Sequence, residues 1–162
     1  MSNQTYYTFV DSPVGRILLV SDGVNLTGLN FETEKRPIKI ESEWVQDDVP
    51  FATAIAQIQA YFAGELHEFD LPLQPDGTLF QRQVWQQLLA IPYGETISYG
   101  ELAKRLGKPT AARAVGMANG ANPIPLVIPC HRVIGSNGRL TGYGGGLPLK
   151  ESLLTHEQSH RM

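Results

Sequence analysis

Three short stretches near the start of the chain have the pattern of β-strands. Residues 6–10 and 16–21 alternate or run apolar, with β-branched and aromatic side chains, and a segment with a proline and a glycine separates them. A third such stretch, 25–31, follows the turn-forming pair Asp22-Gly23. Short strands linked by turn residues predict a small antiparallel sheet.

A charged segment separates these stretches from the first expected helix. Residues 32–50 show no clear period and predict a loop, with a short strand around 38–40. Apolar residues then recur at helical spacing over 51–62, which predicts a helix packed on the sheet. A further strand is expected over 66–73.

Beyond residue 77 the pattern becomes helical. Thr78 and Gln81 have the spacing of a capping box, so a helix is expected to begin there and to end near Gly94. One face of this helix is apolar, and we interpret it as core packing. The face consists of Phe80, Val84, Trp85, Leu88 and Leu89. With a sheet first and helices after it, the predicted fold class is α+β.

Two shorter helices follow. Ser98 and Glu101 repeat the capping-box spacing for a helix that ends at Gly107, and Thr110 is expected to cap a helix over 111–118. Two short helices joined by so short a turn are typical of a helix-turn-helix.

The second of these helices is rich in small side chains, among them Ala112 and Gly116. Small side chains suit close approach of a partner, but a tightly packed structural helix would look the same. Arg113 in the middle of the helix, with basic residues around it, favours DNA.

Charge is divided between the two halves of the chain. Prolines, Asp76 and Gly77 mark a boundary, from which we predict an N-terminal domain, 1–76, and a C-terminal domain, 77–162. Up to Gly77 there are 4 basic and 12 acidic residues, whereas the remainder has 9 basic and 4 acidic ones. The net charge of −3 therefore hides a basic half, which is either an ordinary solvated face or a footprint for phosphates.

The chain has one cysteine among its 162 residues. A single thiol forms no internal disulfide and builds no zinc site from several thiolates. We see neither a signal peptide nor an apolar run of membrane-spanning length, and we expect a cytoplasmic protein, monomeric, without a metal, a cofactor or a membrane partner.

That cysteine, Cys130, follows a short apolar run. Leu126 to Ile128 is interpreted as a buried strand that Pro129 ends, which would hold the thiol at a strand end. Unpaired cysteines are often simply buried. His131, which can take a proton from a thiol, and the positive charge of Arg132 favour a nucleophile, because the thiolate is the reactive form.

The motif Pro129-Cys130-His131-Arg132-Val133, with Asn122-Pro123 before it and a glycine-rich run at 142–146 after it, resembles the active-site signature of the O6-alkylguanine-DNA alkyltransferases. These are also called methylated-DNA-protein-cysteine methyltransferases. Three further ordered blocks, 97–103, 111–116 and 150–157, extend the resemblance over most of the C-terminal half. Four blocks at compatible spacing are far more specific than one pentapeptide.

The resemblance implies a ribonuclease H-like N-terminal sheet and a mostly helical, DNA-binding C-terminal domain. It implies irreversible transfer of an alkyl group from O6 of guanine in double-stranded DNA to Cys130, in a single turnover with base flipping and no cofactor. The accepted alkyl size and the repair of O4-alkylthymine stay open.

The resemblance also implies roles for individual residues. The tyrosine matching Tyr99 protonates the flipped guanine, the asparagine matching Asn122 braces the turn beneath the site, and the arginine matching Arg113 fills the gap in the duplex. Tyr99 could instead be packed, and Asn122 could be an ordinary turn residue. Further DNA contacts are expected at Ser98, Thr110, Ala112 and Gly116, and the base pocket at Val133, Met117, Tyr143 and Gly144.

For thiol activation we predict a relay in which Glu157 orients His131 and His131 deprotonates Cys130. Adjacent residues of an extended backbone point to opposite sides, so imidazole and sulfur can meet only if the chain turns there or a water bridges them. We expect the water. His131 could instead be structural, and Glu157 an exposed carboxylate at a helix end.

Three rival functions are weaker. A non-enzymatic relative that only binds alkylated DNA would have the cysteine replaced. A helix-turn-helix regulator would not need the Cys-His pair, and a thiol hydrolase would need an oxyanion-type motif.

Overall fold

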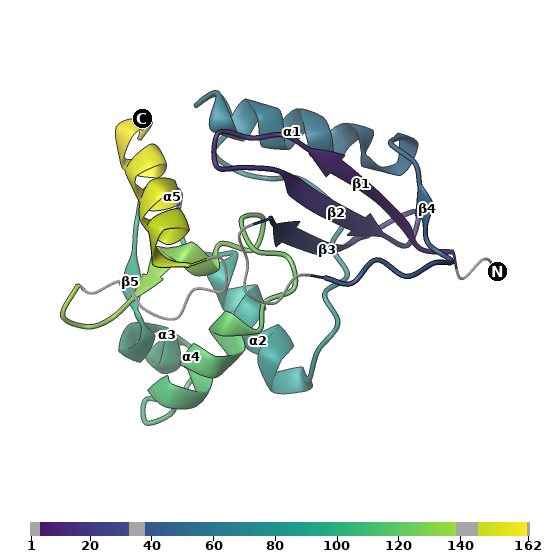
Figure 1. Cartoon of the computed structure of the whole chain (residues 1–162). Coiled ribbons are helices and arrows are strands. Elements are labelled where there is room, and N and C mark those ends of the chain that lie inside the picture. Colours follow the sequence, from purple (N-terminus) through teal and green to yellow (C-terminus); the bar gives the residue numbers. More distant parts are fainter. Residues whose placement is uncertain (1–3, 33–37, 139–145, 162) are drawn as a thin grey trace.

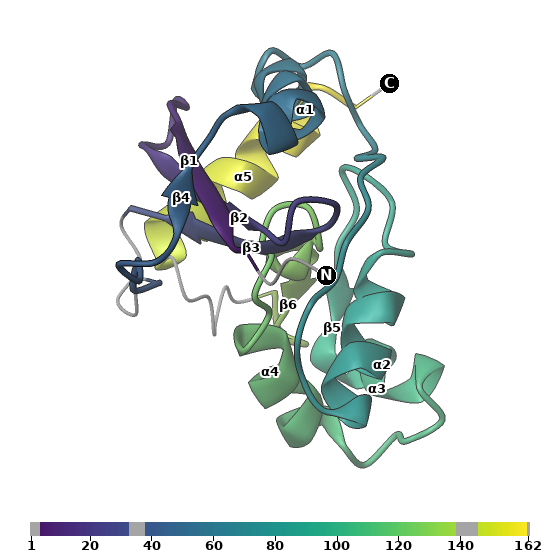
Figure 2. The same ribbon diagram turned by 90° about the vertical axis from the view of Figure 1, so that its right-hand side faces the viewer.

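The computed structural model describes residues 4–32, 38–138 and 146–161, which form two lobes side by side (Figures 1 and 2). The N-terminal lobe has a four-stranded sheet in the order β3-β2-β1-β4. Its strands are β1 (Tyr6–Val10), β2 (Ile17–Ser21), β3 (Leu26–Phe31) and β4 (Val45–Gln46). The first three pair antiparallel, as predicted, and β4 joins β1 in parallel.

The interior position of β2 explains its composition. All five of its residues are buried, and strands flank it on both sides. After the short helix η1 (Val49–Phe51), helix α1 (Ala52–Phe62) lies along the sheet (Figure 1). The helix buries Ala54, Ile58 and Tyr61, which lie on one helical face.

The C-terminal lobe is mostly helical. Its elements in chain order are α2 (Leu79–Leu88), β5 (Ile97–Ser98), α3 (Tyr99–Arg105), α4 (Ala112–Gly120), η2 (Cys130–Arg132), β6 (Val133–Ile134) and α5 (Leu147–Ser159). The capping box of α2 is confirmed, since Thr78 and Gln81 bond each other's backbone NH. Val84, Trp85 and Leu88 are buried, and the Trp85 indole donates to the Ala118 carbonyl of α4 at 2.8 Å.

Helix α5 returns from the C-terminal lobe to the N-terminal one. Both views show it beside α1 (Figures 1 and 2), and His156 of α5 bonds the Tyr61 carbonyl at 2.7 Å. The buried apolar residues form one cluster that runs through both lobes. In the described ranges, no helix is both long and apolar enough to cross a membrane.

Several local predictions were wrong. Residues 38–40 are not a strand, and the fourth strand lies at 45–46 instead. The stretch 66–73 is irregular except for a single bridge from Leu73 to Leu26, because Pro72 and the charged residues leave it few positions that can pair.

Two predicted helix caps also need correction. Thr110 does not cap α4. The N-cap residue of α4 is Ala111, which makes no side-chain hydrogen bond there. Ser98 does cap α3 by accepting from the Glu101 amide at 3.0 Å, but the Glu101 carboxylate pairs with Arg105 one turn later.

Candidate active site

The stretch before the cysteine is a tight buried turn and not the predicted strand. Leu126 has a positive φ of 76°, which is rare for a bulky residue and interrupts any extended run. The Asn122 side chain closes the turn at both ends, donating to the Ile128 carbonyl at 2.7 Å and accepting from the Ile124 amide at 2.9 Å. An apolar run of this length fits either structure, and the side chain of Asn122 selects the turn.

Cys130 begins the 3-10 helix η2 and does not sit at a strand end. The backbone therefore turns at Cys130 and His131, which is the alternative to an extended backbone with opposed side chains. The cysteine is 4% exposed. Its backbone amide donates to Ile128 at 2.7 Å, and Asn119 donates to its carbonyl at 3.3 Å. An electrophile must therefore be delivered into the site to reach this sulfur.

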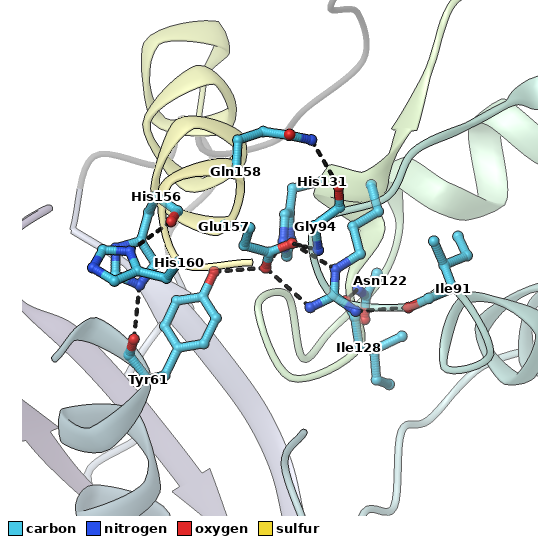
Figure 3. A network of polar contacts seen from close by, with 11 residues as sticks. Tyr61, Ile91, Gly94, Asn122, Ile128, His131, His156, Glu157, Gln158 and His160 are labelled. Carbon is cyan, nitrogen blue, oxygen red and sulfur yellow. Dashed lines mark hydrogen bonds and ion pairs between the residues drawn. The ribbon is translucent and has the colours of Figure 1, made fainter. Parts of the chain in front are cut away.

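The carboxylate of Glu157 is the centre of a buried network (Figure 3). Its Oε2 accepts from Tyr61 Oη at 2.7 Å, His131 Nε2 at 2.7 Å and Arg132 Nη2 at 3.0 Å. Its Oε1 accepts from Arg132 Nε at 2.8 Å and from the Gly94 amide at 3.3 Å. Glu157 is thus not an exposed helix-end carboxylate, and five donors favour its ionised form.

These contacts determine the protonation of the pair. Burial alone would raise the pKa of Glu157, but the hydrogen bonds from His131 and the charge of Arg132 outweigh burial and lower it. Burial lowers the pKa of His131, which is therefore neutral near pH 7. With Nε2–H donated to an ionised carboxylate, the lone pair of the ring lies on Nδ1. Nδ1 is buried and has no hydrogen-bond partner among the described residues.

A buried cation lies on the other side of the site. Lys150 of α5 is 0% exposed, and its Nζ donates to the Val133 carbonyl at 2.6 Å and lies 5.9 Å from the centre of the Tyr99 ring. Burial lowers the pKa of Lys150 to about 8, against the opposing effect of negative charge on Cys130. The ammonium group therefore links the thiol electrostatically to the predicted proton donor, Tyr99.

The predicted DNA contacts lie along α4 and around it. Arg113 is exposed, and so is Met117, which was predicted for the base pocket and is 76% exposed. The two residues are four apart and hence lie on one face of the helix. Thr110 is exposed just before the helix, and Ala112 and Ser98 are partly buried.

The predicted DNA contact Gly116 and the predicted pocket residue Val133 lie deeper. Gly116 faces inward, where an added Cβ would contact the Tyr99 ring at 3.7 Å. Val133 is fully buried, and its carbonyl accepts from Lys150 Nζ. Tyr143 and Gly144 lie outside the described residues.

Sequence reasoning missed four contributors to this site: Tyr61, Gly94, Asn119 and Lys150. The sequence pattern placed Tyr61 among the apolar positions of a helix, and its partner Glu157 lies 96 residues further along the chain. Lys150 belongs to the matched block 150–157, but the resemblance assigned it no role. Its only signal in the sequence was a cation on a helix expected to pack.

Comparisons with known proteins match nearly the whole chain. The model "6-O-methylguanine DNA methyltransferase, ribonuclease-like domain" matches residues 5–75, and "6-O-methylguanine DNA methyltransferase, DNA binding domain" matches 79–159. A methylated-DNA–protein-cysteine methyltransferase of Methanosarcina acetivorans is 53% identical over 95% of this chain and 99% of its own length. One of Mycobacterium tuberculosis is 52% identical over 95% of this chain and 93% of its own.

The chain belongs to the 6-O-methylguanine DNA methyltransferase family. The family predicted from the four sequence blocks is therefore confirmed, and with it the methyltransferase class of its relatives.

Solved structures of family members confirm the α+β fold. The crystal structure of the Mycobacterium tuberculosis protein in complex with DNA is 51% identical and has a TM-score of 0.89, covering 96% of this chain and 94% of that one. A more distant member from the archaeon Pyrococcus kodakaraensis is 26% identical with a TM-score of 0.63, over 95% of this chain and 99% of that one.

Proposed function

We propose that the protein repairs double-stranded DNA by transferring an alkyl group from O6 of guanine to Cys130, once per molecule. The observation that carries the proposal is the hydrogen bond between His131 and Glu157, 2.7 Å long and buried, beside the cysteine in η2. This arrangement supplies a base to the single thiol of a chain whose family acts on methylated DNA.

Deprotonation is the first step. His131 is neutral and its Nδ1 lone pair has no partner among the residues described, so it can accept the thiol proton through one bridging water. Glu157 then stabilises the imidazolium through Nε2–H, and the Lys150 ammonium favours charge on sulfur.

Transfer is a displacement at carbon. The Cys130 thiolate attacks the alkyl carbon, an S–C bond forms, and the C–O6 bond breaks with its electron pair on oxygen. Tyr99 donates its phenol proton to the departing guanine, and Lys150 near its ring offsets the charge that the phenol gains. The product thioether has no second thiol to remove it, because the chain has one cysteine. Each molecule is therefore consumed.

Flipping follows from the burial of the thiol. With Cys130 4% exposed, O6 of a stacked base is out of reach, so the damaged nucleotide must leave the duplex. The exposed Arg113 on α4 is suited to fill the gap, and Met117 on the same face to line the base pocket. Basic residues around the two helices contact phosphates, so binding should weaken with salt.

We also propose that the chain divides functionally at residues 76 and 77. The separate family models for 5–75 and 79–159 support this division, as does the irregular segment between α1 and α2.

The test is transfer of a labelled methyl group. Duplex DNA with one tritiated O6-methylguanine is incubated with the protein and with Cys130→Ala, and protein and DNA are counted separately. Label should move to the native protein and stay on DNA with the variant. The proposal would be refuted if the label stayed on the DNA with both proteins, or if it left the DNA with both proteins.

A further inference from the structure

The N-terminal lobe reaches into the active site through one hydroxyl group. Oε2 of Glu157 accepts from three side chains, and two of them, His131 and Arg132, come from η2. The third, Tyr61, comes from α1 in the other lobe, and its Oη lies 2.7 Å from Oε2 (Figure 3).

Packing fixes the position of this hydroxyl. Tyr61 is fully buried, with its ring stacked on Phe69 at 5.5 Å and edge-on to Tyr93 at 6.0 Å between centroids. Its backbone carbonyl accepts from His156 of α5, the helix that also carries Glu157. Side chain and main chain of Tyr61 are therefore both joined to α5, and the hydroxyl cannot turn away from Oε2 without breaking this packing.

Tyr61 is not needed to orient the carboxylate. Arg132 already holds both oxygens, with Nε on Oε1 at 2.8 Å and Nη2 on Oε2 at 3.0 Å. A further O–H donor on Oε2 instead competes with the His131 N–H for the negative charge on that oxygen, and so weakens the bond from His131.

Several charged and titratable groups act on the His131 ring. Arg132 beside it and Lys150 on α5 disfavour a positive imidazole, and Glu157 favours one. Cys130 precedes His131 in η2, and Tyr93 lies beside Tyr61 with a buried hydroxyl that has no partner among the described residues. Tyr61 acts on the ring only through Glu157, by weakening the attraction that this carboxylate exerts.

We propose that Tyr61 is a positioning residue through which the N-terminal lobe sets the proton affinity of His131. By taking up part of the charge on Oε2, its hydroxyl keeps the imidazole neutral at rest, with Nδ1 available as the base. The proposal rests on the proposed function in assigning His131 as that base, but it concerns the protein without DNA.

The test is proton NMR of the Nε2–H of His131, whose hydrogen bond to Glu157 is buried and short. We compare the native protein with Tyr61→Phe and with Tyr93→Phe as a matched control. The control removes a buried hydroxyl from the same aromatic cluster, but that hydroxyl has no partner in the described part of the chain. With Tyr61→Phe the Nε2–H resonance should move downfield, because the bond to Oε2 strengthens, and with Tyr93→Phe it should stay in place.

A second substitution gives the opposite sign and preserves the hydroxyl. Replacing Tyr61 by 3-fluorotyrosine makes it a stronger donor, so the resonance should move upfield. An unmoved resonance, a displacement of the reverse sign, or equal displacement in the control would overturn the proposal. Since no DNA or alkyl transfer is involved, such a result would leave the proposed repair reaction untouched.

Discussion

Glu157→Gln removes one charge while keeping the shape of the side chain, and we expect it to be severely destabilising. An amide has one acceptor oxygen and one NH2 group, whereas the carboxylate meets three donors at Oε2 and two at Oε1. Whichever way the amide is turned, its NH2 group faces at least two of these donors. At least two buried donors therefore lose their acceptor, and Arg132 loses its counter-ion.

The size of the loss follows from these contacts. A buried donor without a partner costs about 1–3 kcal/mol, and removing one partner of a buried ion pair costs about 3–5 kcal/mol. These figures describe overlapping effects and are not to be added. We expect the free energy of unfolding to fall by about 3–5 kcal/mol, a large fraction of the roughly 5–15 kcal/mol typical of a domain.

Urea unfolding followed by tryptophan fluorescence at pH 7 measures this loss. The matched control is Glu151→Gln, the same change at an exposed position of the same helix, which should stay within about 0.5 kcal/mol of the native protein. If Glu157→Gln were no less stable than Glu151→Gln, the five-donor network would not be what stabilises the site.

The effect should also depend on pH. The pKa of Glu157 is lowered in the folded protein, so its stabilisation is complete above the unfolded-state pKa of about 4.3 and is lost as pH falls toward the folded-state pKa. The stability difference between the native protein and Glu157→Gln should therefore be greatest near neutral pH and shrink below about pH 4. A difference that grows with acidification would contradict the assigned ionisation.

Three further substitutions test the site residues. Arg113→Ala should slow transfer from duplex DNA about tenfold or more while leaving the reaction with free O6-methylguanine unchanged. Lys104→Ala on α3 should lack this selectivity. Equal losses on both substrates would remove the proposed role of Arg113 in flipping. Tyr99→Phe should lower the transfer rate by about 10²-fold with little change in duplex affinity, measured by single-turnover kinetics and fluorescence anisotropy, and an unchanged rate would exclude it as proton donor. Asn122→Ala should lower the free energy of unfolding by about 1–3 kcal/mol in thermal unfolding, because it takes two bonds from the turn before Cys130, and a stability equal to that of the native protein would show that the turn holds without them.

Local sequence patterns correctly predicted those structural features that depend on residues close together in the chain. The first three strands and α1 follow from residue alternation and helical spacing, and the cap of α2 follows from Thr78 and Gln81, which supply both halves of the motif. The pairing of Ser98 with Glu101 was half wrong, because Arg105 competes for the same carboxylate. The spacing of a motif shows which hydrogen bonds can form. It does not show whether another residue competes for the same group.

The errors and omissions arise from tertiary structure. Leu126 to Ile128 lie in a turn because the Asn122 side chain bonds both the Ile124 amide and the Ile128 carbonyl, which a three-residue apolar run does not reveal. Tyr61 meets Glu157 because α5 packs beside α1, a contact between helices 96 residues apart in the chain. The Cys-His pair could be found from the sequence because its members are adjacent, and Glu157 was found through the resemblance, whereas Tyr61 and Lys150 could not be assigned to the site.

The central claim is that Cys130 accepts the alkyl group and is consumed by doing so. The most direct measurement adds a large excess of duplex containing O6-methylguanine to the protein and follows intact mass and peptide mass over time. We predict that the protein gains one methyl group per molecule, mapped to Cys130, and that guanine formation stops at one equivalent. Continued guanine formation beyond one equivalent, or a methyl group on another residue, would contradict the account.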